Sequence, residues 1–190
     1  EILKGQRDIL QLVEPRSELT LQITDGNGIS FPVLFRFLST DLARSNTREY
    51  IYGDSGAADT NLLYFRAMCR AVQRIHTLQI CHRDLKPENF FIIRPGEICL
   101  GDFGTARILN GSAPPMLSQY ASWRGDRRYT APEMFAGLDK DTTLFYRADI
   151  FSLGAILFEM FTKQNLNAQI FDAAFQNEFL EAFQLIPDAR

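Results

Sequence analysis

Two stretches within the first forty residues carry the alternating or β-branched residues that are typical of strands. These are residues 8–13 and 19–23. Residues 25–28, with the sequence DGNG, are a strong turn signal, and an apolar run over residues 29–38 follows it. The pattern therefore predicts a small, mostly antiparallel sheet at the start of the chain.

A change of period after residue 59 predicts a helix. Residues 44–59 are polar and contain glycine, which favours a linker with at most one short helix. Asp59 or Thr60 can then cap a helix, and Arg66, Arg70 and Arg74 fall on a face that we expect to be solvated. Apolar residues recur at spacings of three and four and predict the buried face, namely Leu62, Phe65, Cys69, Val72, Ile75 and Leu78.

The second half of the chain predicts a hairpin, a loop and a central helix. Residues 90–93 and 98–100 are short apolar runs around a Pro-Gly turn, which is typical of a β-hairpin. Residues 110–120 are rich in Gly, Ser and Pro and predict a flexible loop. Residues 149–161 carry apolar side chains all round, a pattern that favours a buried helix.

Composition indicates one ordinary globular domain. The 190 residues are 46% hydrophobic and 23% charged, and the net charge of −3 gives no reason to expect nucleic acid or an anionic membrane as a partner. The three cysteines lack the spacing of zinc or disulfide sites, so we expect reduced thiols in a cytoplasmic setting. The longest apolar run is too short to span a membrane, and no secretory signal is seen.

Several motifs occur in a fixed order. The sequence HRDLKPEN occupies residues 82–89, Asp-Phe-Gly residues 102–104 and Ala-Pro-Glu residues 131–133, and Asp149 opens the predicted central helix. From about residue 31 to residue 162 this order resembles the catalytic core of eukaryotic-type (Hanks-type) Ser/Thr protein kinases. The resemblance implies a partial kinase domain over residues 1–190 with an α+β fold. Residues 1–38 would be a remnant of the N-lobe and hinge strand, and residues 39–190 a mainly helical C-lobe, truncated after the central helix.

The chemistry of phosphoryl transfer explains the residue types. The protein has to place an acceptor hydroxyl and neutralise phosphate charge with magnesium, which prefers hard oxygen ligands. Asn89 and Asp102 offer such oxygens, and the hairpin between them can bring both to one edge. The resemblance implies that Asp84 is the base and that Lys86 binds the transferring phosphate of ATP. A lysine at that position is typical of kinases that act on Ser or Thr, so the expected partner is a protein substrate.

The apolar strand before residue 42 resembles the adenine-binding hinge. On this interpretation Phe35 is the gatekeeper, and the backbone of Arg36 and Leu38 bonds the adenine edge. Asp41 would lie near the ribose and Phe91 beneath the adenine. The alternative is an ordinary apolar strand that ends at a turn.

The remaining motif residues have implied structural or regulatory roles. The resemblance implies that His82, Phe103, Gly104, Glu133 and Asp149 shape the site, with His82 a packing residue and not the base. Arg83 would pair with a phosphate on the following segment. The candidate acceptors in that segment are Thr105, Ser112, Ser118 and Ser122. An active full-length protein without phosphate between residues 104 and 130, by mass spectrometry, would exclude this hypothesis.

The sequence also departs from the family pattern. Asp126 stands where these kinases usually place a threonine, which brings a second carboxylate near Asp84 and should raise the pKa of one of them. We nevertheless expect Asp126→Thr to be tolerated. Neither a glycine-rich loop nor a strand lysine precedes residue 31, since Lys4 lies in helical context. These 190 residues alone should therefore have little or no kinase activity.

The sequence is also compatible with two other functions. A pseudokinase or interaction module could use the same fold as a binding surface, although it would have no physical reason to keep Asp84, Lys86, Asn89 and Asp102 together. A phosphotransferase acting on small molecules is the other possibility. The Ala-Pro-Glu motif and the long preceding segment favour a protein substrate instead.

Overall fold

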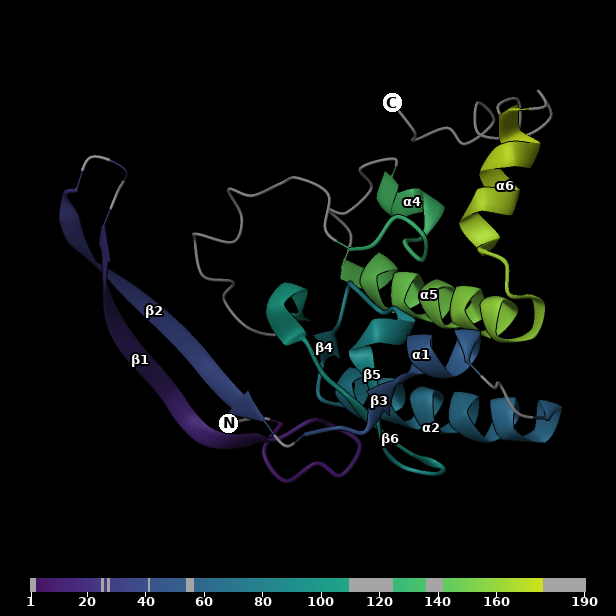
Figure 1. Ribbon diagram of the computed structural model, residues 1–190. Helices are drawn as coiled ribbons and strands as arrows, with labels where there is room; N and C mark the ends of the chain where they lie inside the picture. Colours follow the sequence, from purple (N-terminus) through teal and green to yellow (C-terminus); the bar gives the residue numbers. More distant parts are fainter. Residues whose placement is uncertain are drawn as a thin grey trace.

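The protein consists of a helical body from which a long two-stranded ribbon extends, as the computed structural model in Figure 1 shows. The structure describes residues 3–24, 26, 28–40, 42–53, 57–109, 125–135 and 142–175. Strands come first and the long helices later, in agreement with the predicted α+β class. No helix among the described residues is both long enough and apolar enough to cross a lipid bilayer.

The ribbon is formed by β1 (Leu12–Thr24) and β2 (Ser30–Thr40), which pair antiparallel. The register places Leu21 opposite Val33, and the neighbouring pairs on that face are also apolar. Leu21 is 44% exposed, so the apolar face of the ribbon is open to solvent. The strand predicted over residues 19–23 lies within β1, whereas residues 8–11 lie outside it and only Leu12 and Val13 of the first predicted strand belong to β1.

The helix predicted after residue 59 is α2 (Ala58–Thr77). Its buried side chains are Asn61, Tyr64, Ala67, Met68, Ala71, Val72 and Ile75. The predicted face is therefore rotated, since Leu62 is 51% exposed, whereas Val72 and Ile75 are buried as expected. Small alanines lie on the true face and allow close packing against α5 (Thr142–Thr162), which apolar periodicity alone does not indicate.

Short strands connect the helices. The predicted hairpin is confirmed as β5 (Phe90–Arg94) and β6 (Glu97–Leu100). Strand β3 (Ser45–Asn46) pairs with β5 on the side away from β6. The single short helix expected in the linker is α1 (Thr47–Tyr52), capped by the Asn46 side chain. A second pair, β4 (Ile80–Cys81) with β7 (Arg107–Ile108), flanks the loop that carries the HRDLKPEN motif.

The central helix α5 begins earlier than predicted, at Thr142 and not at Asp149. The helix is not buried on all sides, because Ile150 is 57% exposed and Phe161 is 47% exposed. Its other face contributes Leu153 and Ile156 to the core, together with α2. Two short helices lie in the motifs themselves. Helix η1 (Pro87–Asn89) ends the HRDLKPEN motif, and η2 (Phe103–Thr105) begins inside Asp-Phe-Gly. Helices α4 (Pro132–Phe135) and α6 (Leu166–Phe175) complete the body.

Candidate active site

The carboxylate of Asp84 is fixed by groups from two separate segments. Its Oδ2 accepts a hydrogen bond from Lys86 Nζ at 2.9 Å, and its Oδ1 accepts one from the backbone N–H of Asp126 at 2.8 Å. Asn89 Nδ2 donates to the backbone carbonyl of Asp84 at 2.8 Å. The side chain of Asp84 is 11% exposed, so this carboxylate is oriented but still reachable from solvent.

Lys86 is the cation of this group. Burial lowers its pKa, but the hydrogen bond to Asp84 and the charges of Asp84, Asp126 and Asp102 outweigh burial, and the net pKa is raised. Lys86 therefore stays protonated at neutral pH. The three aspartates that act on it come from three different loops, which the fold brings together.

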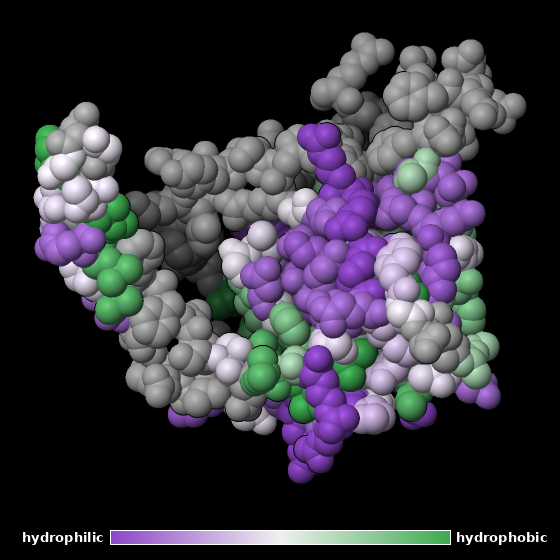
Figure 2. Space-filling model, in the orientation of Figure 1, coloured by the Kyte–Doolittle hydropathy of each residue, from purple (hydrophilic) through white to green (hydrophobic). Residues whose placement is uncertain are grey.

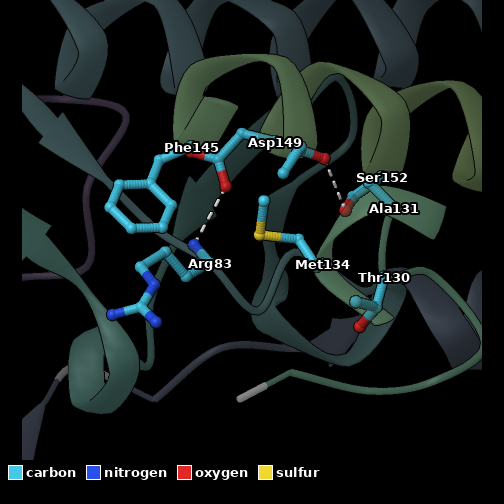
Figure 3. Close-up of a pocket in the computed structure, with 8 residues that line it drawn as sticks. Arg83, Thr130, Ala131, Met134, Phe145, Asp149 and Ser152 are labelled. Carbon is cyan, nitrogen blue, oxygen red and sulfur yellow. Dashed lines mark hydrogen bonds between the residues drawn. The ribbon is translucent and has the colours of Figure 1, made fainter. Parts of the chain in front are cut away.

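Asp149 anchors the loop that contains Asp84. Its carboxylate, 1% exposed, accepts the backbone N–H groups of His82 and Arg83, each at 2.9 Å. His76 Nε2 lies 2.8 Å from the same carboxylate. Figure 3 shows Asp149 pointing from α5 towards the backbone of Arg83. Arg83 has a φ of 69°, a strained conformation for a non-glycine residue, and two charge-assisted bonds help to hold it.

His82 is buried and joins the two motif loops. Its Nε2 lies 2.9 Å from the backbone oxygen of Gly101, and its ring packs against Phe103 with centroids 5.0 Å apart. Burial lowers the pKa of His82, which keeps the imidazole neutral at physiological pH. An imidazole in this position orients the loops and has no access to a substrate.

Asn89 and Asp102 lie at the same open end of the β5–β6 hairpin. Phe90 pairs with Leu100, and just beyond this pair the Gly101 N–H donates to the Asn89 carbonyl at 3.0 Å. Asp102 follows directly, with an exposed side chain and left-handed backbone angles (φ 56°, ψ 67°). Such strain is typical of functional sites. The arrangement offers hard oxygen atoms of the type that magnesium prefers.

Gly101 is required next to this end of the hairpin. A Cβ atom there would lie 2.8 Å from Cε2 of the Phe91 ring, closer than real carbon contacts allow. Phe91 is half-buried in β5 and therefore packs directly on the backbone that leads into Asp102. No larger residue fits at position 101 without moving that ring.

The carboxylate of Asp126 turns towards Arg128. Arg128 Nε lies 3.0 Å from Oδ1, and its Nη2 lies 2.7 Å from Oδ2. Burial raises the pKa of Asp126, but the bonds from Arg128 and the charge of Lys86 prevail, and the net pKa is lowered. The expected rise in pKa is therefore wrong for Asp126, because the sequence does not show that the Arg128 guanidinium pairs with its carboxylate.

Sequence reasoning missed a polar network beneath the same turn. Glu159 of α5 is 2% exposed in its side chain and receives Arg48 Nη1 at 2.7 Å and the hydroxyls of Tyr52 and Tyr129, each at 2.5 Å. Burial and the bond to Glu159 raise the pKa of Tyr129. Arg48 also binds Glu88 at 3.0 Å. The sequence signal for this network is Glu159, an acidic residue inside the apolar run of α5.

The nucleotide-binding prediction is described only in part. Phe35 and Arg36 pair with Leu19 and Glu18 in the ribbon, and Leu38 also belongs to β2, but their side chains lie outside the described part. Asp41 lies outside the described residues altogether. The hinge interpretation therefore stays a prediction.

Of the residues predicted to be regulatory, Arg83 contacts Phe145. The guanidinium carbon of Arg83 lies 4.8 Å from the centre of the Phe145 ring, and that of Arg107 lies 5.4 Å from it. The Thr105 hydroxyl donates to the His82 carbonyl at 2.9 Å and is therefore engaged in the structure. Glu133 lies in the first turn of α4. Ser112, Ser118 and Ser122 lie outside the described residues.

A small cavity lies between the loop of Arg83 and helix α5 and is too small for a nucleotide. Its volume is about 30 Å³, room for about one water molecule, and Figure 3 shows Met134 and Ser152 among its lining. Nearby, His76, Cys81 and Asp149 bring their ligand-type atoms within 4.8 Å of one another. Asp149 accepts three hydrogen bonds in this cluster, and two of them anchor the loop that contains His82 and Arg83. Burial raises the pKa of the Cys81 thiol to about 12.

The residues of the candidate site lie in a part of the chain that is similar to known proteins. Residues 36–188 match the family model described as "Protein kinase domain". The chain is 41% identical over 96 residues, half its length, to a probable serine/threonine-protein kinase, glkA, of Dictyostelium discoideum, and the match covers 19% of that protein. It is 32% identical over 138 residues, 73% of its length, to the probable serine/threonine-protein kinase PknB of Corynebacterium glutamicum, covering 20% of that protein.

A third relative is matched over more of its length. A probable cell division protein kinase of Encephalitozoon cuniculi is 29% identical over 159 residues, which is 83% of this chain and 54% of that protein. The chain thus spans about a fifth of the length of the first two relatives and about half of the third.

Proposed function

The chain belongs to the protein kinase family, and from this premise we propose that the protein transfers the γ-phosphate of ATP to Ser or Thr hydroxyls of protein substrates. The observation that carries the proposal is the fixed carboxylate of Asp84. Lys86 and the Asp126 N–H donate to its two oxygens, and the side chain is still 11% exposed, so a substrate hydroxyl could reach it. Orientation of this kind lowers the barrier because the reacting groups no longer have to be aligned.

In the proposed reaction Asp84 accepts the proton of the substrate hydroxyl. The hydroxyl oxygen forms a bond to the γ-phosphorus while the bond to the bridging oxygen breaks and ADP leaves. Lys86, protonated and 23% exposed in its side chain, would bind the oxygens of the transferring group. Its contact with Asp84 keeps the cation beside the base.

Asn89 and Asp102 would hold magnesium. Both offer hard oxygen ligands at the open end of one hairpin, and the exposed carboxylate of Asp102 can be reached by an ion. When bound, the ion would neutralise charge on the phosphates. The strained backbone of Asp102 directs its side chain into the loop after β6, where Gly104 N–H contacts it at 3.4 Å.

Phosphate transfer to Ser/Thr peptides tests this proposal. With the full-length protein and ATP labelled at the γ position, Asp84→Asn should lower kcat by at least about 100-fold, because general base catalysis is lost. Asp8→Asn is the matched control, since Asp8 forms a surface ion pair with Arg74 at 3.1 Å. An Asp84→Asn protein with undiminished transfer would disprove the assignment. ATP binding without any transfer would favour the non-catalytic alternative.

A further inference from the structure

Asp126 binds the catalytic loop and Arg128 through different groups. Its backbone N–H donates to Asp84, while its carboxylate takes three donors from Arg128, namely the backbone N–H at 3.0 Å, Nε at 3.0 Å and Nη2 at 2.7 Å. A planar guanidinium in such a two-pronged contact fixes the direction of the carboxylate as well as its position. The charged end of Asp126 is therefore directed to Arg128 and not to Lys86.

Lys86 and Asp126 contact the same carboxylate, because Lys86 Nζ donates to Asp84 Oδ2 at 2.9 Å and the Asp126 N–H donates to Oδ1 at 2.8 Å. The charge of Asp126 contributes to the raised pKa of Lys86, and the charge of Lys86 contributes to the lowered pKa of Asp126. Both groups are partly buried, where attraction between opposite charges is stronger than in water. A carboxylate at position 126 without its own partner would therefore compete with Asp84 for Lys86.

We propose that Arg128 is a positioning residue that holds the carboxylate of Asp126 away from Lys86, so that Lys86 remains bound to Asp84. The inference rests on the proposed roles of Asp84 and Lys86. Arg128 acts through Asp126, and it compensates for the carboxylate that stands where related kinases usually have a threonine.

The surroundings of Arg128 support this role. Its Nη2 also binds Glu88 Oε1 at 3.0 Å, and Glu88 in turn binds Arg48 Nε at 3.0 Å. Arg128 thus faces Glu88 from η1 and the Tyr129 ring, whose centre lies 5.4 Å from the guanidinium carbon. The charge of Lys86 acts on Asp126. Arg128 is held from two sides by carboxylates, so its direction does not depend on Asp126 alone.

One single and one double variant of the full-length protein test the proposal. Arg128→Ala should lower kcat for peptide phosphorylation at least about tenfold, equal to about 1.4 kcal/mol, because Lys86 is then shared between two carboxylates. The double variant Arg128→Ala/Asp126→Asn should recover most of that loss, since the competing charge is gone. Arg94→Ala is the control, because Arg94 is 72% exposed and pairs with Glu97 on the β5–β6 turn.

A purely structural role for Arg128 predicts a different result. Loss of its contact with Glu88 would persist in the double variant, so kcat would stay low. Absence of recovery, or an unchanged kcat in Arg128→Ala, would overturn the proposal.

A second measurement does not depend on catalysis. The pKa of the Asp126 carboxyl, followed by carbon-13 NMR, should rise in Arg128→Ala because its guanidinium partner is lost. An unchanged pKa would contradict the ion pair as the cause. If the wild-type protein transfers no phosphate, the proposed function fails, while this titration still decides whether Arg128 controls Asp126.

Discussion

Gly125 and Gly154 differ in the space that a side chain would meet. Gly125 has a φ of 105°, and a Cβ atom there would lie 2.7 Å from the Arg83 carbonyl oxygen. Gly154 lies in α5 with no atom within 4 Å of the corresponding position. Gly125 thus permits the turn that carries Asp126 to approach the loop of residues 82–89 closely. Gly154 has no such requirement.

These two positions give opposite predictions for the same substitution. Gly125→Ala should lower the free energy of unfolding by about 1–3 kcal/mol through strain and the clash with Arg83. Gly154→Ala should raise it by about 0.5–1 kcal/mol because alanine loses less entropy in a helix. Urea denaturation of both variants measures the difference. Equal effects at the two positions would show that the approach to Arg83 is not tight.

At the scale of elements, α6 supports the turn between Asp126 and Thr130. Asn167, 2% exposed, donates through Nδ2 to the carbonyls of Arg127 at 2.7 Å and Thr130 at 2.8 Å. Asn165 donates to the carbonyl of Arg128 at 2.9 Å. Two asparagines at the start of one helix therefore hold the turn whose N–H group orients Asp84.

Asn167→Leu should loosen this turn. Two carbonyls would lose a buried donor, at a cost of about 1–3 kcal/mol for each group left unpaired. The amide protons of Tyr129 and Thr130, both bonded to the Asp126 carbonyl, should then exchange faster with solvent. Hydrogen exchange read by NMR tests this, with Gln169→Leu on the exposed side of α6 as the control. Unchanged exchange at both amides would assign the support to other contacts.

At the scale of the whole molecule, the ribbon and the body differ in how they bury apolar surface. The body packs α2, α5 and the β5–β6 hairpin into one core. The ribbon leaves Leu19 49%, Leu21 44% and Ile23 38% exposed on one face. Figure 2 shows green apolar patches on the ribbon. An exposed apolar sheet face favours association between molecules.

Substitution on that face should therefore change association without weakening the fold. The variant Leu19→Thr/Leu21→Thr should show less self-association of the 190-residue chain in sedimentation velocity, while its Tm stays close to that of the wild type. Threonine keeps the strand propensity that the pairing with β2 needs. A marked fall in Tm would mean that these side chains stabilise the monomer itself.

Local sequence determined the motif residues, the β5–β6 hairpin, α2 and the single short helix α1, because each depends on residues near one another in the chain. Turn chemistry and period are local properties, so they can be inferred without a fold. The same locality explains the errors. The start of α5 and the rotation of the buried face of α2 depend on which helix packs against which.

Only the tertiary structure decided how the site is held together. Asp149 reaches the backbone of Arg83 across 66 residues, Asp126 reaches Asp84 across 42, and Arg48 reaches Glu159 across 111. The sequence named Asp84, Lys86, Asn89 and Asp102 as candidates, but it could not show that Arg128 takes the carboxylate of Asp126. Partners of a charged side chain are chosen by distance in space, which the order of residues does not specify.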